Sequence, residues 1–187
     1  MDRPFAKYVS VLGRRFARSE RGVAAVEFAL ILPLMAMLYL GGFEVMEGIS
    51  AKRQVTQTAS TIALIVTQYS NISASQQMPG IMAASSAVLT PFSASNATVT
   101  VSLIKIDSSG QATVSWSCTS ANCTSGRPTG QVVTVPGALD IPNTYLVFGE
   151  TTYTYKPLID FIPIGTKSLY SSIYMAPRQP GAIILAS

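Results

Sequence analysis

A single long run of apolar residues restricts the fold of this chain more than any other feature. Residues 23–43 contain one charged residue, Glu27. As a helix they rise about 31 Å, close to the ~30 Å hydrocarbon core of a bilayer. A secretory signal has a shorter apolar region, about 7–15 residues, and a small-residue cleavage site, and neither fits here. The run therefore predicts a membrane-spanning helix, loosened at one turn by Pro33.

The net charge of +4 comes entirely from the residues before this run. Residues 1–22 carry six of the 13 basic residues and two of the nine acidic ones, so the rest of the chain is neutral. Basic residues are absent just after the run. The positive-inside rule therefore predicts a cytoplasmic leader at 1–22 and an extracytoplasmic location for everything beyond about residue 44. A neutral domain without a basic stripe is not expected to bind nucleic acid.

The chain contains no histidine. This removes the commonest general base and the commonest metal ligand. The sequence also lacks a Gly-rich phosphate loop, a nucleophile motif and paired carboxylates at a recognisable spacing. We therefore expect no enzyme activity, no cofactor and no metal site.

The two cysteines, Cys118 and Cys123, lie close together in a Ser/Thr-rich stretch. Without His or further Cys they make a poor zinc site, and they lack the two-residue spacing of a redox motif. In an oxidising compartment they predict a small disulfide loop, with a stabilisation of about 2 kcal/mol. The alternative is two unpaired small residues in a loop.

The patterns beyond the run predict an α+β domain. The long helix continues to about Tyr69, with an apolar stripe through Val55, Ala59, Ile62 and Val66. A second, short helix fits residues 76–89, capped by Ser75, with Pro79 in its first turn and Pro91 after its end.

Alternating apolar positions indicate an antiparallel sheet packed against these helices. Val114 and Trp116 are expected on one face of their strand. The tyrosines at alternating strand positions are interpreted mainly as sheet packing, with adhesive contacts as the alternative. The predicted strands begin at Val99, before a turn at 107–110, and continue at 111–117, 132–135, 144–155 and 167–175. The predicted organisation is a leader at 1–22, a spanning helix at 23–43, its continuation at 44–70 and a domain at 71–187.

Glu27 is unusual because a carboxylate in a spanning helix costs about 2.5–3.5 kcal/mol at the bilayer centre, and somewhat less near the edge. If the chain is cut after Gly22, Val23 gains a free amine four residues before Glu27. Ammonium and carboxylate can then pair, within one chain or between neighbours, and set the axial register of an assembly. On the residues alone, an ordinary signal anchor with a tolerated Glu is the alternative.

The segment Arg21-Gly22-Val-Ala-Ala-Val-Glu27-Phe28-Ala-Leu-Ile-Leu-Pro33, with Gly42-Phe43-Glu44 downstream, resembles the TadE/TadG-like minor pseudopilins of the tight-adherence (Tad/Flp) type IV pilus system. The resemblance implies cleavage between Gly22 and Val23 by a prepilin peptidase, and a processing or assembly role for Glu27 with Phe28. It also implies a pilin-like α+β fold.

By the same resemblance, the protein is expected to cross the bacterial inner membrane once, with its C-terminal domain in the periplasm or in a surface pilus. The implied partners are other pilins, the peptidase, the inner-membrane assembly platform and membrane lipid. Major Flp pilins are much shorter, so the resemblance implies a minor subunit for pilus assembly, initiation or tip formation, and hence adherence. A signal-anchored periplasmic binding module is the alternative.

Four charged residues follow the apolar run: Glu44, Glu47, Lys52 and Arg53. The two glutamates can pair with Lys52 or Arg53 of a neighbouring subunit. The simpler interpretation, which we prefer, is that they are solvated charges that mark the membrane boundary.

Overall fold

The computed structural model describes residues 20–120, 122–157, 165–179 and 181–186. The chain divides into two compact units, Met1–Val45 and Met46–Ser187, and the division falls within one long helix. The predicted leader lies outside the described residues, apart from its last three positions. The predicted fold class is confirmed: a long N-terminal helix, a short second helix and an antiparallel sheet.

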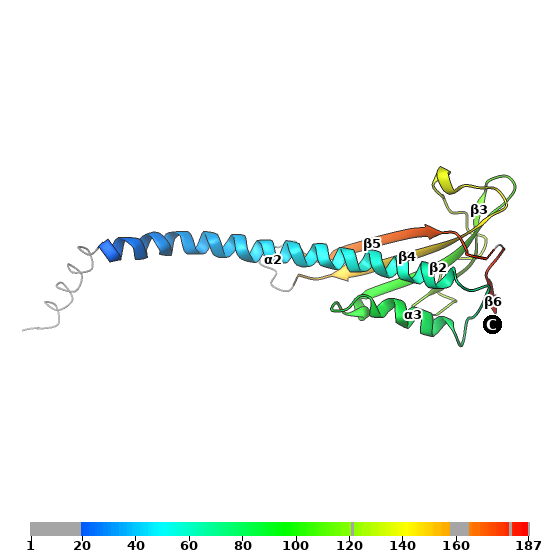
Figure 1. Cartoon of the computed structure of the whole chain (residues 1–187), viewed down its shortest axis with the longest axis horizontal. Helices are drawn as coiled ribbons and strands as arrows, with labels where there is room; N and C mark the ends of the chain where they lie inside the picture. Colours follow the sequence, from blue (N-terminus) through cyan, green and yellow to red (C-terminus); the bar gives the residue numbers. More distant parts are fainter. Residues whose placement is uncertain (1–19, 121, 158–164, 180, 187) are drawn as a thin grey trace, which may run out of the picture. The chain divides into compact units, whose positions relative to one another are not determined.

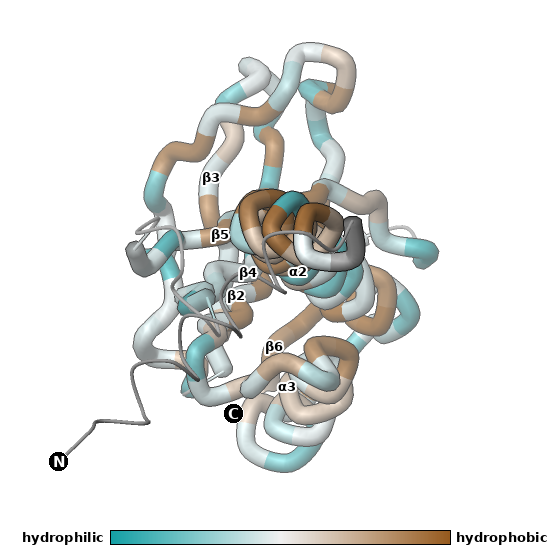
Figure 2. The backbone as a smooth tube through the Cα atoms, turned by 90° about the vertical axis from the view of Figure 1, so that its left-hand side faces the viewer, coloured by the Kyte–Doolittle hydropathy of each residue, from teal (hydrophilic) through white to brown (hydrophobic). Residues whose placement is uncertain are grey.

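The long helix, α2, spans Glu20–Val66 and continues through Pro33 (Figure 1). In the first unit its large apolar side chains are exposed around the helix, and Figure 2 shows apolar residues, in brown, along this part of α2. Among the described residues, one helix is long and apolar enough to cross a membrane, judged by length and composition. A single N-terminal helix of this kind is consistent with membrane anchoring.

The second unit joins the C-terminal part of α2 to a short helix and a four-stranded antiparallel sheet. The strands lie in the order β3-β2-β4-β5, and a separate parallel pair joins β1 to β6. The elements after α2 are β1 (Asn71–Ser73), α3 (Met78–Ala87), η1 (Ala94–Asn96), β2 (Ala97–Ile106), β3 (Ala112–Thr119), η2 (Gly137–Leu139), β4 (Tyr145–Tyr155), β5 (Lys167–Met175) and β6 (Ile184–Ala186).

One face of the sheet, here called the helix face, packs against α2 and α3. The main core joins Ile62, Ala63 and Val66 of α2 and the buried residues of α3 to Val99, Val101, Leu103 and Val147 of the sheet. Gly149 marks the closest approach, because a Cβ built there would lie 2.5 Å from the carbonyl oxygen of Ala59. A side chain larger than hydrogen at this position would push α2 off the sheet.

The opposite face, here called the outer face, carries a second and smaller core. Its buried members are Ile104, Ile106, Ala112, Val114, Leu146 and Phe148, and the segment that contains Val133, Val135 and Leu139 covers them. Coverage on both sides explains why successive residues are buried in the central parts of β2 and β4.

The prediction that Val114 and Trp116 share a face is wrong. Leu103 pairs with Trp116 whereas Ile104 pairs with Val114, so Ser115 is an extra residue in β3. This β-bulge reverses the alternation. Trp116 therefore packs in the main core, where its Nε1 donates to the carbonyl of Ile183, and Val114 lies in the outer-face core.

Other expectations differ in detail from the structure. The predicted strand at 132–135 is an extended loop with one bridge, between Thr113 and Val132, because Pro128 and Pro136 flank it. Helix α3 begins after Gln77 without a side-chain cap, so Ser75 does not cap it, while Pro79 does lie in its first turn. The long helix ends at Val66, before Tyr69.

Candidate functional site

The predicted cleavage site lies in the first turn of α2. Gly22 and Val23 are both helical, and the side chains of Val23, Glu27 and Phe28 are exposed. Val23 and Glu27 are four residues apart, so they project from the same side of the helix about one turn apart. This spacing brings an amine at residue 23 within reach of the Glu27 carboxylate once the preceding residues are removed.

The charged groups that follow the apolar run differ in their surroundings. Glu44 is only 4% exposed and Glu47 is half-buried, so the interpretation of both as solvated charges does not hold. Lys52 and Arg53 are exposed, and the Lys52 Nζ donates to the backbone carbonyl of Tyr170. Pairing of the glutamates with Lys52 or Arg53 of a neighbouring subunit stays a prediction.

A disulfide joins Cys118 and Cys123, with an S–S distance of 2.00 Å. The turn between them is held by Asn122, whose carbonyl accepts from Thr119 N at 2.8 Å and whose Oδ1 accepts from Ser125 N at 2.7 Å. Gly126 then passes so close to β3 that a Cβ there would lie 2.5 Å from the Ser117 Oγ. The next residue, Arg127, lies on the outer face, where it meets Glu150.

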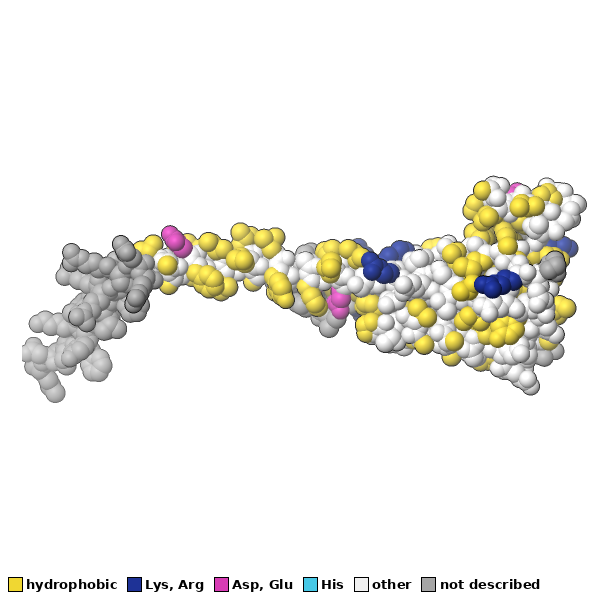
Figure 3. Space-filling view, in the orientation of Figure 1, with side chains coloured by type: hydrophobic (Ala, Val, Ile, Leu, Met, Phe, Trp, Pro, Cys, Tyr) yellow, Lys and Arg dark blue, Asp and Glu magenta, His cyan; other side chains and the backbone are white. Residues whose placement is uncertain are grey.

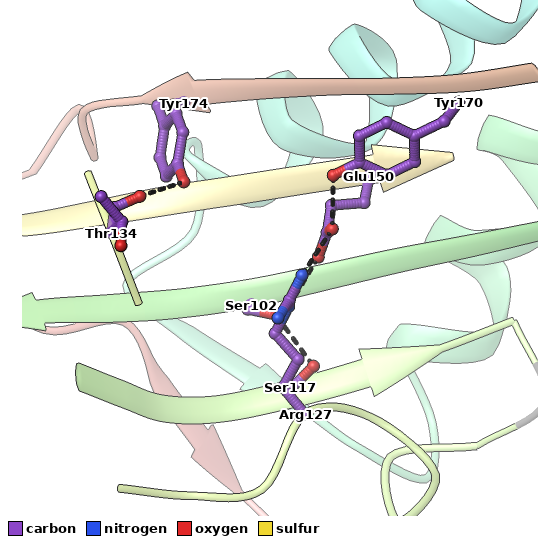
Figure 4. A network of polar contacts seen from close by, with 7 residues as sticks. All are labelled: Ser102, Ser117, Arg127, Thr134, Glu150, Tyr170 and Tyr174. Atoms are coloured by element: carbon purple, nitrogen blue, oxygen red, sulfur yellow. Dashed lines mark hydrogen bonds and ion pairs between the residues drawn. The ribbon is translucent and has the colours of Figure 1, made fainter. Parts of the chain in front are cut away.

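Arg127 makes a two-pronged ion pair with Glu150 on the outer face (Figure 4). Its Nε donates to Glu150 Oε2 at 2.8 Å and its Nη2 to Oε1 at 2.7 Å. The Tyr170 hydroxyl donates to the same Oε1 at 2.7 Å. The Glu150 carboxylate therefore accepts three hydrogen bonds. Glu150 is only 7% exposed, and a charge buried in a domain needs such partners.

The electrostatics agree with this geometry. The hydrogen bond to Glu150 raises the pKa of the Arg127 guanidinium. Burial, above all, raises the pKa of Tyr170, and the bond of its hydroxyl to the Glu150 carboxylate raises it further. Burial also raises the pKa of Tyr174, with a smaller contribution from Glu150. Both tyrosine hydroxyls therefore stay protonated at neutral pH, and that of Tyr170 can donate to the Glu150 carboxylate.

Aromatic rings continue the network toward the loop that covers the outer face. The Arg127 guanidinium lies 5.5 Å from the centroid of the Phe148 ring, and that ring stacks on Tyr174 with centroids 4.2 Å apart. The Tyr174 hydroxyl donates to the carbonyl of Thr134, and Ser102 is hydrogen-bonded to Ser117 beneath Arg127 (Figure 4). The network fastens the segment from 118 to 135 onto the sheet.

Sequence reasoning missed this network. Arg127 lies in a predicted loop, 23 residues from its partner, and no local pattern joins the two. One signal was present: Glu150 directly follows the apolar stretch 145–149 of β4, and an acidic residue buried in a strand needs a polar or cationic partner.

A long apolar N-terminal helix, a short second helix and a four-stranded antiparallel sheet define the class of the protein, an α+β domain that follows an apolar helix. Residues 22–64 match the family model described as TadE-like protein, which confirms the predicted resemblance over that segment. No curated protein and no solved structure matches the chain. A TadE-like domain suggests a protein associated with Tad pili.

Proposed function

We propose that this chain is a minor pseudopilin of a Tad/Flp-type pilus, cut after Gly22 and required for pilus assembly, initiation or tip formation. The observation that carries the proposal is the TadE-like match at residues 22–64, which begins at the predicted cleavage site and covers the exposed apolar half of α2. A structural subunit of this kind needs no catalytic residues of its own.

The proposed processing step is hydrolysis of the Gly22–Val23 peptide bond by a membrane-embedded prepilin peptidase. Water adds across the bond, residues 1–22 leave with a new carboxylate, and Val23 keeps the new amine. A peptidase binds an extended backbone, so the first turn of α2 has to unwind. Gly22 favours this unwinding, because a glycine in a helix destabilises the helix by about 1 kcal/mol relative to alanine.

The proposed role of Glu27 begins after this cut. Between Gly22 and Phe43 it is the sole charged residue, and its carboxylate has no hydrogen-bond or ion-pair partner among the described residues. The Val23 ammonium, in the same or the adjacent subunit, is the proposed ion-pair partner of the Glu27 carboxylate. Inside a bundle of apolar helices an unpaired charge is costly, so subunits stack at the register that pairs them.

We further propose that the leader faces the cytoplasm and that the unit after Val45 faces the periplasm, where other pilins and the inner-membrane assembly platform meet it. The leader carries the excess of basic residues, and a disulfide such as that of Cys118 and Cys123 persists in an oxidising compartment.

The mature N-terminus tests the proposal. The full chain is produced with and without a prepilin peptidase, and its intact mass is measured. We expect loss of residues 1–22 only when the peptidase is present. Gly22→Leu should prevent the cut. The control is Gly42→Leu in the same helix, where a Cβ meets nothing within 4 Å, and it should be cut normally.

An unchanged mass in both cultures would contradict the proposal and leave an anchored periplasmic binding module as the function. Cutting of the Gly22→Leu variant at the same bond would remove Gly22 from the recognition step.

A further inference from the structure

One end of the second unit gathers exposed basic side chains, and we call Lys52, Arg53, Lys156 and Lys167 the basic end. Three contacts show that they belong together. Lys167 is the Cα partner of Tyr155, the residue before Lys156, and a Cβ built at Gly48 of α2 would lie 3.9 Å from the Tyr155 ring. Lys52 reaches the backbone of β5 from α2. Figure 3 shows Lys and Arg side chains, in dark blue, on this part of α2.

The residues that precede the basic end on α2 are apolar and exposed. Met46 is 68% exposed and Ile49 53%, and the next exposed large apolar residue of α2 is Leu64. The helix thus changes within a few residues from exposed apolar to exposed basic side chains. Long basic side chains that follow an apolar surface can keep their stems on it and extend their charged ends to the headgroups of a membrane.

The cations of the basic end are not neutralised by described residues. Among the described side chains the one ion pair is that of Arg127 with Glu150, so none of the four basic-end residues has an acidic partner among the described residues. The acids on the same stretch of α2 are Glu44, which is buried, and Glu47, which is half-buried. Among the described residues, the fully exposed charges at this end are therefore positive, with the half-buried Glu47 beside them.

We propose that the basic end binds the phosphate groups of anionic phospholipids in the leaflet from which α2 emerges. The inference rests on the proposed membrane anchoring. Lys52 lies three residues beyond Ile49, the last exposed large apolar residue before it on α2, a rise of about 5 Å. The headgroup layer is about 5–8 Å thick on each side of the hydrocarbon core, so the Lys52 ammonium can reach the phosphates. Ammonium and guanidinium groups donate charge-assisted hydrogen bonds to phosphate oxygens.

The test is lipid retention by the purified full-length chain. The protein, in detergent, is mixed with equal amounts of phosphatidylglycerol and phosphatidylcholine, and the bound lipids are counted by native mass spectrometry. The variant is Arg53→Gln with Lys167→Gln, which keeps the hydrogen bond of Lys52. The matched control, Lys105→Gln with Arg178→Gln, removes one Lys and one Arg that are exposed elsewhere on the same unit.

We expect the preference for phosphatidylglycerol to fall about fivefold for each cation removed in the basic-end variant, since each basic residue near an anionic surface contributes ~1 kcal/mol. The control should keep the preference. An equal loss in both variants would show a general effect of net charge, and no loss in either would show that the basic end binds no lipid; both overturn the inference.

A third result also overturns it: unchanged lipid preference with a loss of pili in the basic-end variant, which would assign these cations to a protein partner. Failure of the proposed function can be told apart from failure of this inference. If the peptidase leaves the chain uncut, the unchanged chain can still prefer phosphatidylglycerol, and the basic-end variant can still lose that preference.

Discussion

The two halves of α2 differ both in composition and in surroundings: residues 23–45 are almost all apolar, whereas residues 46–66 mix apolar with polar and charged residues. Before Val45 the large apolar side chains are exposed, whereas beyond it Val55, Ala59, Ile62 and Val66 are fully buried against the sheet. A helix that is apolar on all sides needs a continuous apolar environment, while one with an apolar stripe needs a single packing partner. The sequence of α2 therefore requires lipid or other apolar helices for its first half and a domain for its second.

The carboxylates of Glu150 and Glu27 also differ in their surroundings. Glu150 lies in the domain with three donors in the same chain. Glu27 lies in the apolar helix with no partner among the described residues. Tertiary structure supplies the partners of the Glu150 carboxylate. We propose that the Glu27 carboxylate gains its partner only when the chain has been cut and assembled.

The largest expected effect is on Glu27. Glu27→Ala should insert into the membrane more readily, by up to about 2.5–3.5 kcal/mol if the residue lies deep in the bilayer, yet fail to support pili because subunits lose their register. Pili are counted by electron microscopy. Glu20→Ala, which removes a carboxylate from the leader, is the control and should give normal numbers. Normal piliation in Glu27→Ala would remove the residue from the mechanism.

Arg127→Ala should destabilise the domain by about 2–3 kcal/mol. This is at or below the ~3–5 kcal/mol typical of breaking a buried pair, because the Arg127 side chain is itself 33% exposed. The substitution leaves the Glu150 charge buried with Tyr170 as its remaining donor. The free energy of unfolding is measured by denaturant titration of the full chain in detergent. The exposed Lys105→Ala is the control, and an equally small change in both variants would show that the pair contributes little.

The smallest effect is expected for the disulfide. Cys118→Ser with Cys123→Ser should lower the free energy of unfolding by about 2 kcal/mol or less, because the loop it closes is short. If the disulfide directs Arg127, the double substitution should also reduce the cost of Arg127→Ala. Additive effects, measured in the same titration as a double-mutant cycle, would show that the disulfide and the ion pair are independent.

The sequence by itself determined the features that depend on local composition. The apolar run predicts the long helix, the alternation predicts a strand at 167–175 that the structure places at Lys167–Met175, and the Cys spacing predicts a loop that the disulfide closes. Periodicity and spacing are properties of neighbouring residues, so they can be read without knowing the fold.

Only the tertiary structure decided how distant segments meet. The bulge at Ser115 sends Val114 and Trp116 to opposite faces, and nothing in the alternating pattern reveals it. The pairing of β1 with β6 joins strands more than a hundred residues apart along the chain. The contact between Arg127 and Glu150 depends on a loop passing over the sheet at Gly126. Such contacts follow from strand register and the packing of the whole domain, which no short stretch of sequence specifies.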